Sequence, residues 1–292
     1  MSHVAATHDL LARRIAEMSA VSSTGGMPND ADEVVAALFR ALEAGDVRAA
    51  ERGANGVWRA VPWVKQGILL AFRIGSVIDM TNYDDKGAPA RLFFFDKHTI
   101  PPRGFDLTDG VRVVPGGSSI RRGAFVASGV VCMPPMFINT GAYVGKNTMV
   151  DSHALVGSCA QVGERVHLSA GAQIGGVLEP VSAAPVIIEN DVLVGGNCGV
   201  YEGTVVRERA VLGAGVILTR GTPVFDLVHE TVYRGDAQRA LEIPAGAVVV
   251  PGARRIRGGW AAEQELSLQT PVIVKYRDAQ TDLATTLEAW LR

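Results

Sequence analysis

Cysteine is scarce in this chain of 292 residues, which contains only three. They are Cys132, Cys159 and Cys198, with neither a CxxC pair nor a Cys/His cluster around them. A disulfide framework needs more cysteines in a shorter chain, and structural zinc needs ligands at closer spacing. The sequence therefore predicts no disulfide network and no bound metal.

Charge of one sign and long apolar runs are missing as well. The chain carries 28 Lys and Arg against 30 Asp and Glu, a formal net charge of −2. This balance gives no global attraction to nucleic acid or to anionic membranes. No apolar run approaches membrane-spanning length, and Arg13, Arg14 and Glu17 interrupt the place where a signal peptide has its apolar core. We expect a soluble cytoplasmic protein that acts on small molecules, not on nucleic acid or membranes.

Helical periodicity dominates the first part of the chain. Residues 31–44 place five apolar side chains on one stripe, with Asp30 as the N-cap and Gly45 as the stop. Residues 61–73 repeat this design. Residues 81–104 are rich in Asp, Gly, Pro and Lys, and we expect a connector with one short apolar strand there.

After about residue 112, glycine becomes frequent and a fixed repeat replaces the helical pattern. Eighteen of the 33 glycines lie between residues 112 and 225. Aliphatic side chains recur every six residues, slip by two residues near residue 180, and then resume; Cys132 is the only exception among 18 positions. The positions are Val114, Ile120, Val126, Cys132, Ile138, Val144, Val150, Val156, Val162, Leu168, Ile174, Ile188, Val194, Val200, Val206, Leu212, Leu218 and Val224.

Two further positions of each hexapeptide follow a rule. The residue four places after the aliphatic one is usually small, as at Ala142, Ala154 and Ala172. Glycine recurs directly after the aliphatic residue, as at Gly145 and Gly163. This pattern suits a parallel β-helix with short flat faces. One aliphatic and one small side chain per face point inward, and glycine or a small polar residue forms the corner.

The stretch from residue 137 to residue 180 resembles a known enzyme family. It reads FINTGAYVGKNTMVDSHALVGSCAQVGERVHLSAGAQIGGVLEP. The pieces VGSCAQVG, VHLS and IGGVLEP stand in the order and spacing typical of the tetrahydrodipicolinate N-succinyltransferases, which are hexapeptide-repeat acyltransferases. VKQGILLAFRI and VRVVPGG before this stretch, and VIVKYRDAQT after it, extend the resemblance over most of residues 30–280.

The resemblance implies an α+β fold built around a left-handed parallel β-helix. We expect an α-helical N-terminal domain with its connector in residues 1–110, the β-helix of hexapeptide repeats in residues 111–255, and a short C-terminal strand and helix in residues 256–292. The left hand, and a homotrimer with active sites between neighbouring prisms, also come from the resemblance. The segment IGGVLEPVSAAPVI is expected to form a loop that reaches toward a neighbour.

The reaction that the resemblance implies is N-acyl transfer in lysine and diaminopimelate biosynthesis. Succinyl-CoA, a co-substrate and not a permanently bound cofactor, would pass its succinyl group to tetrahydrodipicolinate, whose cyclic imine must first add water and open. Water addition needs an acid and a base, and the attacking amine must lose a proton. The CoA thiolate leaves readily, so that no acyl-enzyme is required.

Three polar residues are candidates for this chemistry. Asp151 follows the inward Val150 at a corner where glycine is usual; a turn aspartate that bonds its own backbone would explain it, whereas the resemblance makes it the catalytic base and a substrate-binding residue. Glu189 follows Ile188 at the same phase, and the resemblance makes it the second catalytic carboxylate. Arg112 aligns with a substrate-binding arginine of the family, and a planar guanidinium suits a carboxylate.

The separation of Asp151 and Glu189 in the sequence exceeds six hexapeptides by two residues, which leaves two arrangements open. If residues 180–187 replace one hexapeptide and add two residues, the two carboxylates lie on the same face, two coils or roughly 10 Å apart. If residues 179–186 are instead looped out of the prism, the two carboxylates lie on different faces.

The neighbouring thiol and imidazole are not interpreted as catalysts. His153 and Cys159 are six residues apart, so they occupy different faces and lack the hydrogen-bond reach that a Cys/His pair needs. We interpret Cys159 as a small outward residue at a packed subunit contact, and Cys132 and Cys198 as core. His153 and His167 are interpreted as structural.

The phosphates of CoA need Lys or Arg near the far end of the prism, but no spacing singles out one residue. The candidates are Arg220, Arg254, Arg255, Arg257 and Lys275. Two rival functions stay open: an acetyl-CoA-dependent N-acetyltransferase of the same fold, and a non-enzymatic or metal-binding prism. His153 and His167 are not separated by a whole number of coils and do not stack, which argues against zinc held by histidines.

Overall fold

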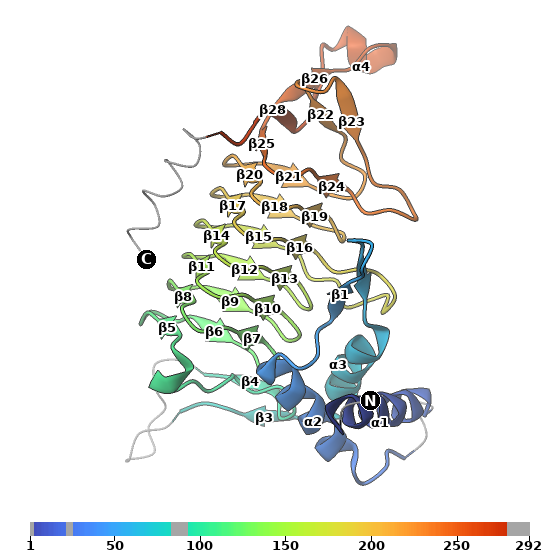
Figure 1. Cartoon of the computed structure of the whole chain (residues 1–292), viewed down its shortest axis with the longest axis vertical. Coiled ribbons are helices and arrows are strands. Elements are labelled where there is room, and N and C mark those ends of the chain that lie inside the picture. The colour runs from blue at the N-terminus through green and yellow to red at the C-terminus, as the bar shows by residue number, and fades with distance from the viewer. Residues whose placement is uncertain (1–2, 22–25, 83–92, 279–292) are drawn as a thin grey trace.

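A left-handed parallel β-helix forms the body of the protein, as the upright stack of coils in Figure 1 shows. The computed structural model describes residues 3–21, 26–82 and 93–278. The chain runs through three sheets in turn, which we name sheets I, II and III. Strands three hexapeptides apart pair in parallel, as Val150 does with Leu168 in sheet I. The fold class expected from the hexapeptide pattern is confirmed.

Short strands make up each sheet of the prism, and most contain two residues. Sheet I contains β5 (Arg112–Val113), β8 (Val131–Cys132), β11 (Met149–Val150), β14 (His167–Leu168), β17 (Leu193–Val194), β20 (Val211–Leu212), β25 (Ala247–Val250), β28 (Val272–Tyr276), β22 (Val224–Asp226) and β23 (Thr231–Tyr233). Sheet II contains β6 (Ser119–Ile120), β9 (Phe137–Ile138), β12 (Leu155–Val156), β15 (Gln173–Ile174), β18 (Gly199–Val200) and β21 (Ile217–Leu218). Sheet III contains β7 (Phe125–Val126), β10 (Tyr143–Val144), β13 (Gln161–Val162), β16 (Ile187–Ile188), β19 (Val205–Val206) and β24 (Glu242–Ile243).

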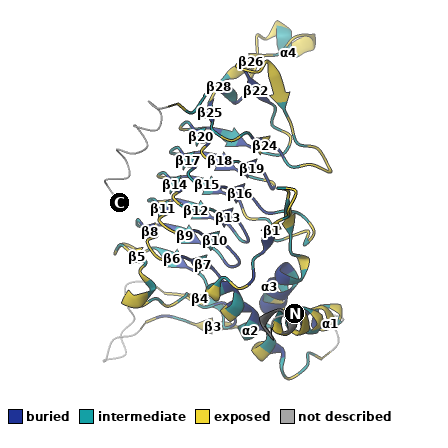
Figure 2. Cartoon of the chain, viewed as in Figure 1, coloured by how far each residue is buried: buried dark blue, intermediate teal, exposed yellow. Residues whose placement is uncertain are grey.

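The six-residue series fills the interior of the prism. Of the 18 positions, all but Val114 are buried, and the small residues between them, such as Ala154 and Ala172, are buried too. Figure 2 shows this interior as the dark centre of the coils. The spacing therefore predicted the core residue by residue, because each face has room for one aliphatic and one small side chain.

One segment leaves the prism between β15 and β16. In sheet III, Tyr143 pairs with Gln161 at the regular interval of three hexapeptides, but Gln161 then pairs with Ile187, so that eight extra residues are looped out. The segment from Gly175 to Val186 that contains these residues is held from outside. Lys65, fully buried, donates from Nζ to the carbonyl oxygen of Ala183 at 2.6 Å.

Three helices build the N-terminal domain, together with two hairpins and a short 3-10 helix. Their bounds are α1 (His3–Ala20), α2 (Ala31–Ala44), α3 (Pro62–Ile74), β1 (Ala50–Arg52) with β2 (Trp58–Ala60), β3 (Val77–Asp79) with β4 (Phe95–Lys97), and η1 (Leu107–Asp109). Gly45 ends α2 in the left-handed conformation with φ of 79°. Asp30 precedes α2 but makes no capping bond and instead pairs with Arg14 of α1 at 2.8 Å.

The two expected helices are confirmed within one residue, whereas α1 and the hairpin β1–β2 were not predicted from the sequence. The hairpin packs on the outer face of sheet III, where Trp58 and Ala50 contact Ile187 and Val205. Figure 1 shows this N-terminal domain at the lower side of the prism. Because of this packing, the N-terminal domain covers part of the outer face of sheet III in its own chain.

The C-terminal part continues beyond the last coils. It adds the hairpin β26 (Ala253–Arg255) with β27 (Ser267–Gln269) and the short helix α4 (Gly259–Glu263). The expected C-terminal helix falls partly on residues 279–292, and the expected connector partly on residues 83–92, which lie outside the described residues. None of the helices in the described part of the chain has the length and apolar character that crossing a bilayer demands.

Gly67 tests how tightly the N-terminal helices pack. A Cβ at this position of α3 would collide with Leu38 of α2 and Ile15 of α1. Although alanine favours helix by up to about 1 kcal/mol, overpacking costs about 1–3 kcal/mol, so we expect Gly67→Ala to lower the free energy of unfolding. Urea denaturation followed by circular dichroism measures it. Gly104→Ala, at an exposed position with no atom within 4 Å of the new Cβ, is the matched control; equal effects of the two changes would contradict the close packing.

Candidate active site

Asp151 lies directly after β11, at the corner where sheet I turns into sheet II. Its Oδ1 accepts a hydrogen bond of 2.7 Å from the backbone N–H of Ser152, so it does make the contact of a turn aspartate. Its other oxygen, Oδ2, lies 3.9 Å from Nε2 of His167, and its side chain is 27% exposed. The carboxylate is therefore oriented by the turn and still open to a ligand.

Arg112 shares sheet I with Asp151. It pairs with Val131 in β8, which pairs with Met149 in β11, so Arg112 lies two coils before the coil that carries Asp151. Two coils correspond to roughly 10 Å along the prism axis, and the Arg112 side chain is exposed. Arg112 is in register with Met149, two residues before Asp151, so both residues belong to the same face of the prism but not to the same corner.

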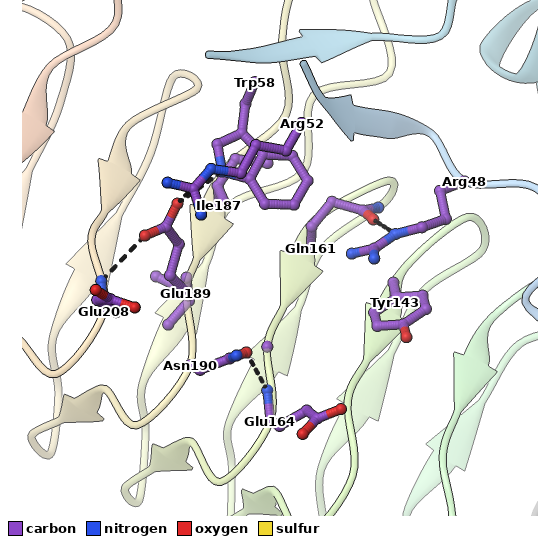
Figure 3. A pocket seen from close by; sticks show the side chains of 12 residues that line it. Arg48, Arg52, Trp58, Tyr143, Gln161, Glu164, Ile187, Glu189, Asn190 and Glu208 are labelled. Atoms are coloured by element: carbon purple, nitrogen blue, oxygen red, sulfur yellow. Dashed lines mark hydrogen bonds and ion pairs between the residues drawn. The ribbon is translucent and has the colours of Figure 1, made fainter. Parts of the chain in front are cut away.

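Glu189 lies after β16, at the corner where sheet III turns into sheet I, and it is almost completely buried (7% exposed). Its Oε1 accepts hydrogen bonds of 2.9 Å from Nε1 of Trp58 and of 2.9 Å from Nη1 of Arg207. Its Oε2 accepts from the backbone N–H of Glu208 at 3.1 Å, and Nε of Arg52 lies 3.7 Å from Oε1. Figure 3 shows this carboxylate at one wall of a pocket of about 280 Å³.

These contacts keep the Glu189 carboxylate ionised. Burial raises the pKa of Glu189, but the hydrogen bonds from Trp58 and Arg207 and the nearby Arg52 outweigh burial and lower that pKa below its ordinary value. A carboxylate has about four acceptor positions, and the three hydrogen bonds named above occupy three of them. Glu189 can accept one more hydrogen bond, but it does not hold a proton to donate near neutral pH.

The arrangement that would align Asp151 and Glu189 on one face is wrong. The strand register stacks Asp151 above Ser169 and Gly195 in sheet I, whereas Glu189 stacks with Gly163 and Arg207 in sheet III. The physical reason is the looped-out segment, which absorbs eight residues without completing a face. The two carboxylates therefore leave the prism at different corners.

Cys159 is buried, but not by a subunit contact as the sequence led us to expect. Its side chain is 0% exposed and packs in the core cluster of the N-terminal domain, which includes Ile68 of α3. Burial raises the pKa of the Cys159 thiol to about 12, an effect that the nearby Lys65 only partly offsets. Cys132 and Cys198 are buried inside the prism, as expected. A protonated, enclosed thiol is a poor nucleophile.

The two histidines have different surroundings. His153 is exposed in the turn between β11 and β12, with φ of 61°, and lies at a different corner from Cys159, as the spacing predicts. His167, interpreted as structural, points outward from β14 beside the Asp151 carboxylate. Among the described residues, no group of three or more His, Cys, Asp or Glu side chains is arranged to hold a metal ion.

The basic candidates for the CoA phosphates are scattered. Arg220 follows β21 and lines two adjoining cavities of about 520 and 730 Å³, which also share Pro180, Ala183 and Glu202. The other candidates lie beyond the prism coils, where Arg254 stacks on Phe225 with Cζ 5.7 Å from the ring centroid. Arg255 pairs with Glu265 at 3.5 Å, and Lys275 pairs with Asp278 at 3.2 Å.

Several residues around Glu189 were not identified from the sequence. Arg207 stands one full coil after Glu189, so the repeat contained a signal for it. Arg48 and Trp58 belong to the N-terminal domain, whose position on the prism no repeat encodes.

Comparison with known proteins gives matches both to the N-terminal helices and to the hexapeptide repeats. The family model "Tetrahydrodipicolinate N-succinyltransferase N-terminal" matches residues 15–74, and "Hexapeptide repeat of succinyl-transferase" matches residues 185–220. A protein of Polynucleobacter asymbioticus named 2,3,4,5-tetrahydropyridine-2,6-dicarboxylate N-succinyltransferase is 41% identical over 269 residues, which cover 91% of each chain. A protein of the same name from Nitrobacter winogradskyi is 43% identical over 257 residues, 86% of each chain.

A solved structure from Campylobacter jejuni, titled as a putative 2,3,4,5-tetrahydropyridine-2-carboxylate N-succinyltransferase, shares the fold. It superimposes with a TM-score of 0.52 at 19% identity, over 87% of this chain and 64% of that chain. At this identity the likeness concerns the fold alone.

Thiol reactivity tests the burial of the cysteines. All three side chains are buried, so we expect no rapid reaction of the native protein with Ellman's reagent and the reaction of all three after denaturation in guanidinium. The reaction is followed by absorbance, and Cys159→Ala identifies the contribution of Cys159. Fast stoichiometric labelling of Cys159 in the native protein would show that the thiol is accessible.

The lowered pKa of Glu189 predicts a pH-dependent stability. A carboxylate whose pKa is lowered in the folded state contributes fully to the free energy of unfolding when the pH is above its ordinary pKa of 4.5. This contribution is lost as the pH falls through the lowered pKa. At neutral pH we therefore expect Glu189→Gln to cost about 1–3 kcal/mol, and the difference from wild type to shrink in acid. Urea denaturation over a pH series measures it.

Glu208→Gln is the control for this change, because it alters an exposed side chain and keeps the backbone donor to Glu189. A difference between wild type and Glu189→Gln that stays constant over the whole pH series would contradict the assignment.

Proposed function

The chain belongs to the tetrahydrodipicolinate N-succinyltransferase family, and on that basis we propose that it transfers a succinyl group from succinyl-CoA to tetrahydrodipicolinate. The observation that carries this proposal is identity of 41% over 91% of the chain, combined with a β-helix that bears Asp151 and Arg112 on one face. The product is N-succinyl-2-amino-6-oxopimelate, an intermediate of diaminopimelate and lysine biosynthesis.

The reaction joins a hydration to an acyl transfer. Water adds across the cyclic C=N bond, and the ring opens at the carbon–nitrogen bond to give a ketone and a primary amine. The amine attacks the thioester carbonyl, a C–N bond forms, and the C–S bond breaks as the CoA thiolate leaves. One proton must leave the nitrogen as the amide forms, and a general base accelerates this step.

Asp151 is the base that takes the proton from the attacking amine. Its carboxylate is partly exposed, and the hydrogen bond from Ser152 to Oδ1 fixes its direction at the corner. Oδ2 is the oxygen that faces away from this turn contact and lies near His167. A carboxylate that is both oriented and open meets the geometric requirement for a general base.

Glu189 assists the hydration as an acceptor and not as an acid. Because its hydrogen bonds lower its pKa, it is ionised at neutral pH. Its remaining acceptor position can orient the water that adds to the imine, and the proton for the imine nitrogen then comes from solvent. Of the acid and base roles that the hydration requires, Glu189 therefore keeps the role of a base that orients water, and it does not donate the proton.

Arg112 binds one carboxylate of the acceptor. It is exposed on sheet I and lies two coils from Asp151. A guanidinium forms two parallel hydrogen bonds with a carboxylate. The acceptor would thus lie across the outer face of sheet I with its amine at Asp151.

An oligomer can bring the two carboxylates to one ligand although they lie apart within a single chain. Asp151 and Glu189 leave one prism at different corners, so one ligand touches both most directly when two chains each supply one of them. We propose a homotrimer with threefold symmetry in which the corner after β11 of one chain faces the corner after β16 of the next. In this arrangement each of three sites takes Asp151 and Arg112 from one chain and Glu189 from its neighbour.

The donor binds beside the looped-out segment. The two adjoining cavities of about 520 and 730 Å³ at Arg220 have the size of sites for cofactor-sized molecules. Arg220 supplies a positive charge there, and the backbone of Gly175 and Gly176 lines the larger cavity. We assign this place to the pantetheine and phosphate portion of succinyl-CoA.

The base assignment is tested by Asp151→Asn. We expect kcat to fall by about 10²- to 10⁴-fold, with little change in the KM for succinyl-CoA, because the amide keeps the shape but cannot take the proton. Release of the CoA thiol is measured with succinyl-CoA and with acetyl-CoA, using tetrahydrodipicolinate or 2-aminopimelate as the acceptor.

Asp46→Asn, at an exposed position of the N-terminal domain, is the matched control. Wild-type turnover in Asp151→Asn would place the base elsewhere. The absence of turnover by the wild-type protein with both donors would overturn the enzymatic function itself, and a preference for acetyl-CoA would replace the succinyl donor.

A further inference from the structure

Arg48 brings a guanidinium into the Glu189 pocket without a carboxylate to neutralise it. It lies between α2 and β1, and its Cζ is 3.6 Å from the ring centroid of Tyr143 and 5.6 Å from that of Trp58. Its Nε donates to Oε1 of Gln161 at 2.9 Å. Within the part of the chain that the structure describes, Arg48 forms no ion pair with an acidic side chain.

Gln161 holds Arg48 in a fixed direction. Gln161 is 1% exposed, and its Nε2 donates to the carbonyl oxygens of Cys159 at 2.9 Å and of Ala160 at 3.4 Å. Its Oε1 must therefore face Arg48. A guanidinium has five N–H donors, and among the described residues only Nε of Arg48 has a hydrogen-bond acceptor. Figure 3 shows the terminal nitrogens directed into the pocket.

Two of the three acidic side chains that line the pocket already have donor partners. Glu189 accepts from Trp58 and Arg207. Glu164 pairs with Arg165 at 3.0 Å. Burial lowers the pKa of Arg48, and the nearby Tyr143 and Glu51 offset this effect only in part. Such a cation is costly, and an anionic ligand would offset that cost.

The chemistry of the pocket selects a carboxylate as this ligand. The volume of about 280 Å³ admits a carboxylate with a few carbons but not a nucleotide. The carboxylates of Glu164, Glu189 and Glu208 line the same pocket, and they repel a phosphate dianion more strongly than a monoanion. The aromatic ring of Trp58, which also lines the pocket, offers a wall for a short carbon chain.

We propose that Arg48, with Arg52 as a second cation, binds next to Glu189 a carboxylate that is remote from the reacting amine or thioester. This assignment rests on the proposed function, in which each reactant carries one such group: the acceptor has a carboxylate at the end away from its amine, and the donor has the succinyl carboxylate. The N-terminal domain is then part of the active site, and Gln161 is a positioning residue that orients the binding arginine.

Arg48→Met tests this subsite with two comparisons. One comparison measures kcat/KM for succinyl-CoA against acetyl-CoA, and the other measures 2-aminopimelate against 2-aminoheptanoate, which lacks the second carboxylate. A charge-assisted contact is worth about 10- to 100-fold, so we expect one of these preferences to fall by that factor. Loss of donor preference assigns Arg48 to the succinyl carboxylate, and loss of acceptor preference assigns it to the acceptor.

Arg40→Met, an exposed arginine of α2, is the matched control and should keep both preferences. Two preferences in Arg48→Met that equal those of wild type would overturn the proposal. Arg48→Lys keeps a charge but loses the planar fork, and we expect a smaller loss in the same comparison.

Binding without turnover separates this proposal from the proposed function. Isothermal titration of wild type and Arg48→Lys with pimelate and with succinate should show weaker binding of one diacid to the variant. Diacid binding by a wild-type protein that releases no CoA thiol would remove the proposed function and keep the carboxylate subsite. Normal turnover with unchanged diacid affinity in the variant would remove the subsite alone.

Discussion

The packing of the prism interior decides where each polar side chain of the site emerges. Every face takes one aliphatic and one small side chain, so a strand cannot shift by one residue without turning its inward residue outward. Asp151, Cys159 and Glu189 consequently lie at three different corners of the prism. The eight looped-out residues change which corner carries Glu189 while the core series continues unbroken.

The N-terminal domain completes what the prism cannot supply. A carboxylate that is 7% exposed, as in Glu189, remains charged only because Trp58 and Arg207 donate to it. Trp58 comes from the hairpin that covers sheet III, and Arg48 of the same region meets Gln161. Cys159 and Lys65 lie at the same junction, so the domain contact that forms the pocket also encloses the thiol and holds the looped-out segment.

Periodicity in the sequence predicted the prism, its inward residues and the phase of Asp151 and Glu189, because the six-residue rule is enforced by local packing. It also predicted the helices at residues 31–44 and 61–73. It could not decide between replacement and loop at residues 179–186, since both give the same phase. Arg48, Trp58 and the enclosure of Cys159 depend on how one domain packs on another, and that contact leaves no period in the sequence.

The proposed active site is shared between chains, with Asp151 from one chain and Glu189 from the next. The most direct measurement mixes Asp151→Asn chains with Glu189→Gln chains, allows the subunits to exchange, and assays thiol release from succinyl-CoA. In a threefold ring, one of four pairings at each interface carries both native residues, so the mixture should regain about a quarter of wild-type activity. A mixture of demonstrated hybrid oligomers that stays as inactive as its two parents would show that both carboxylates act within one chain.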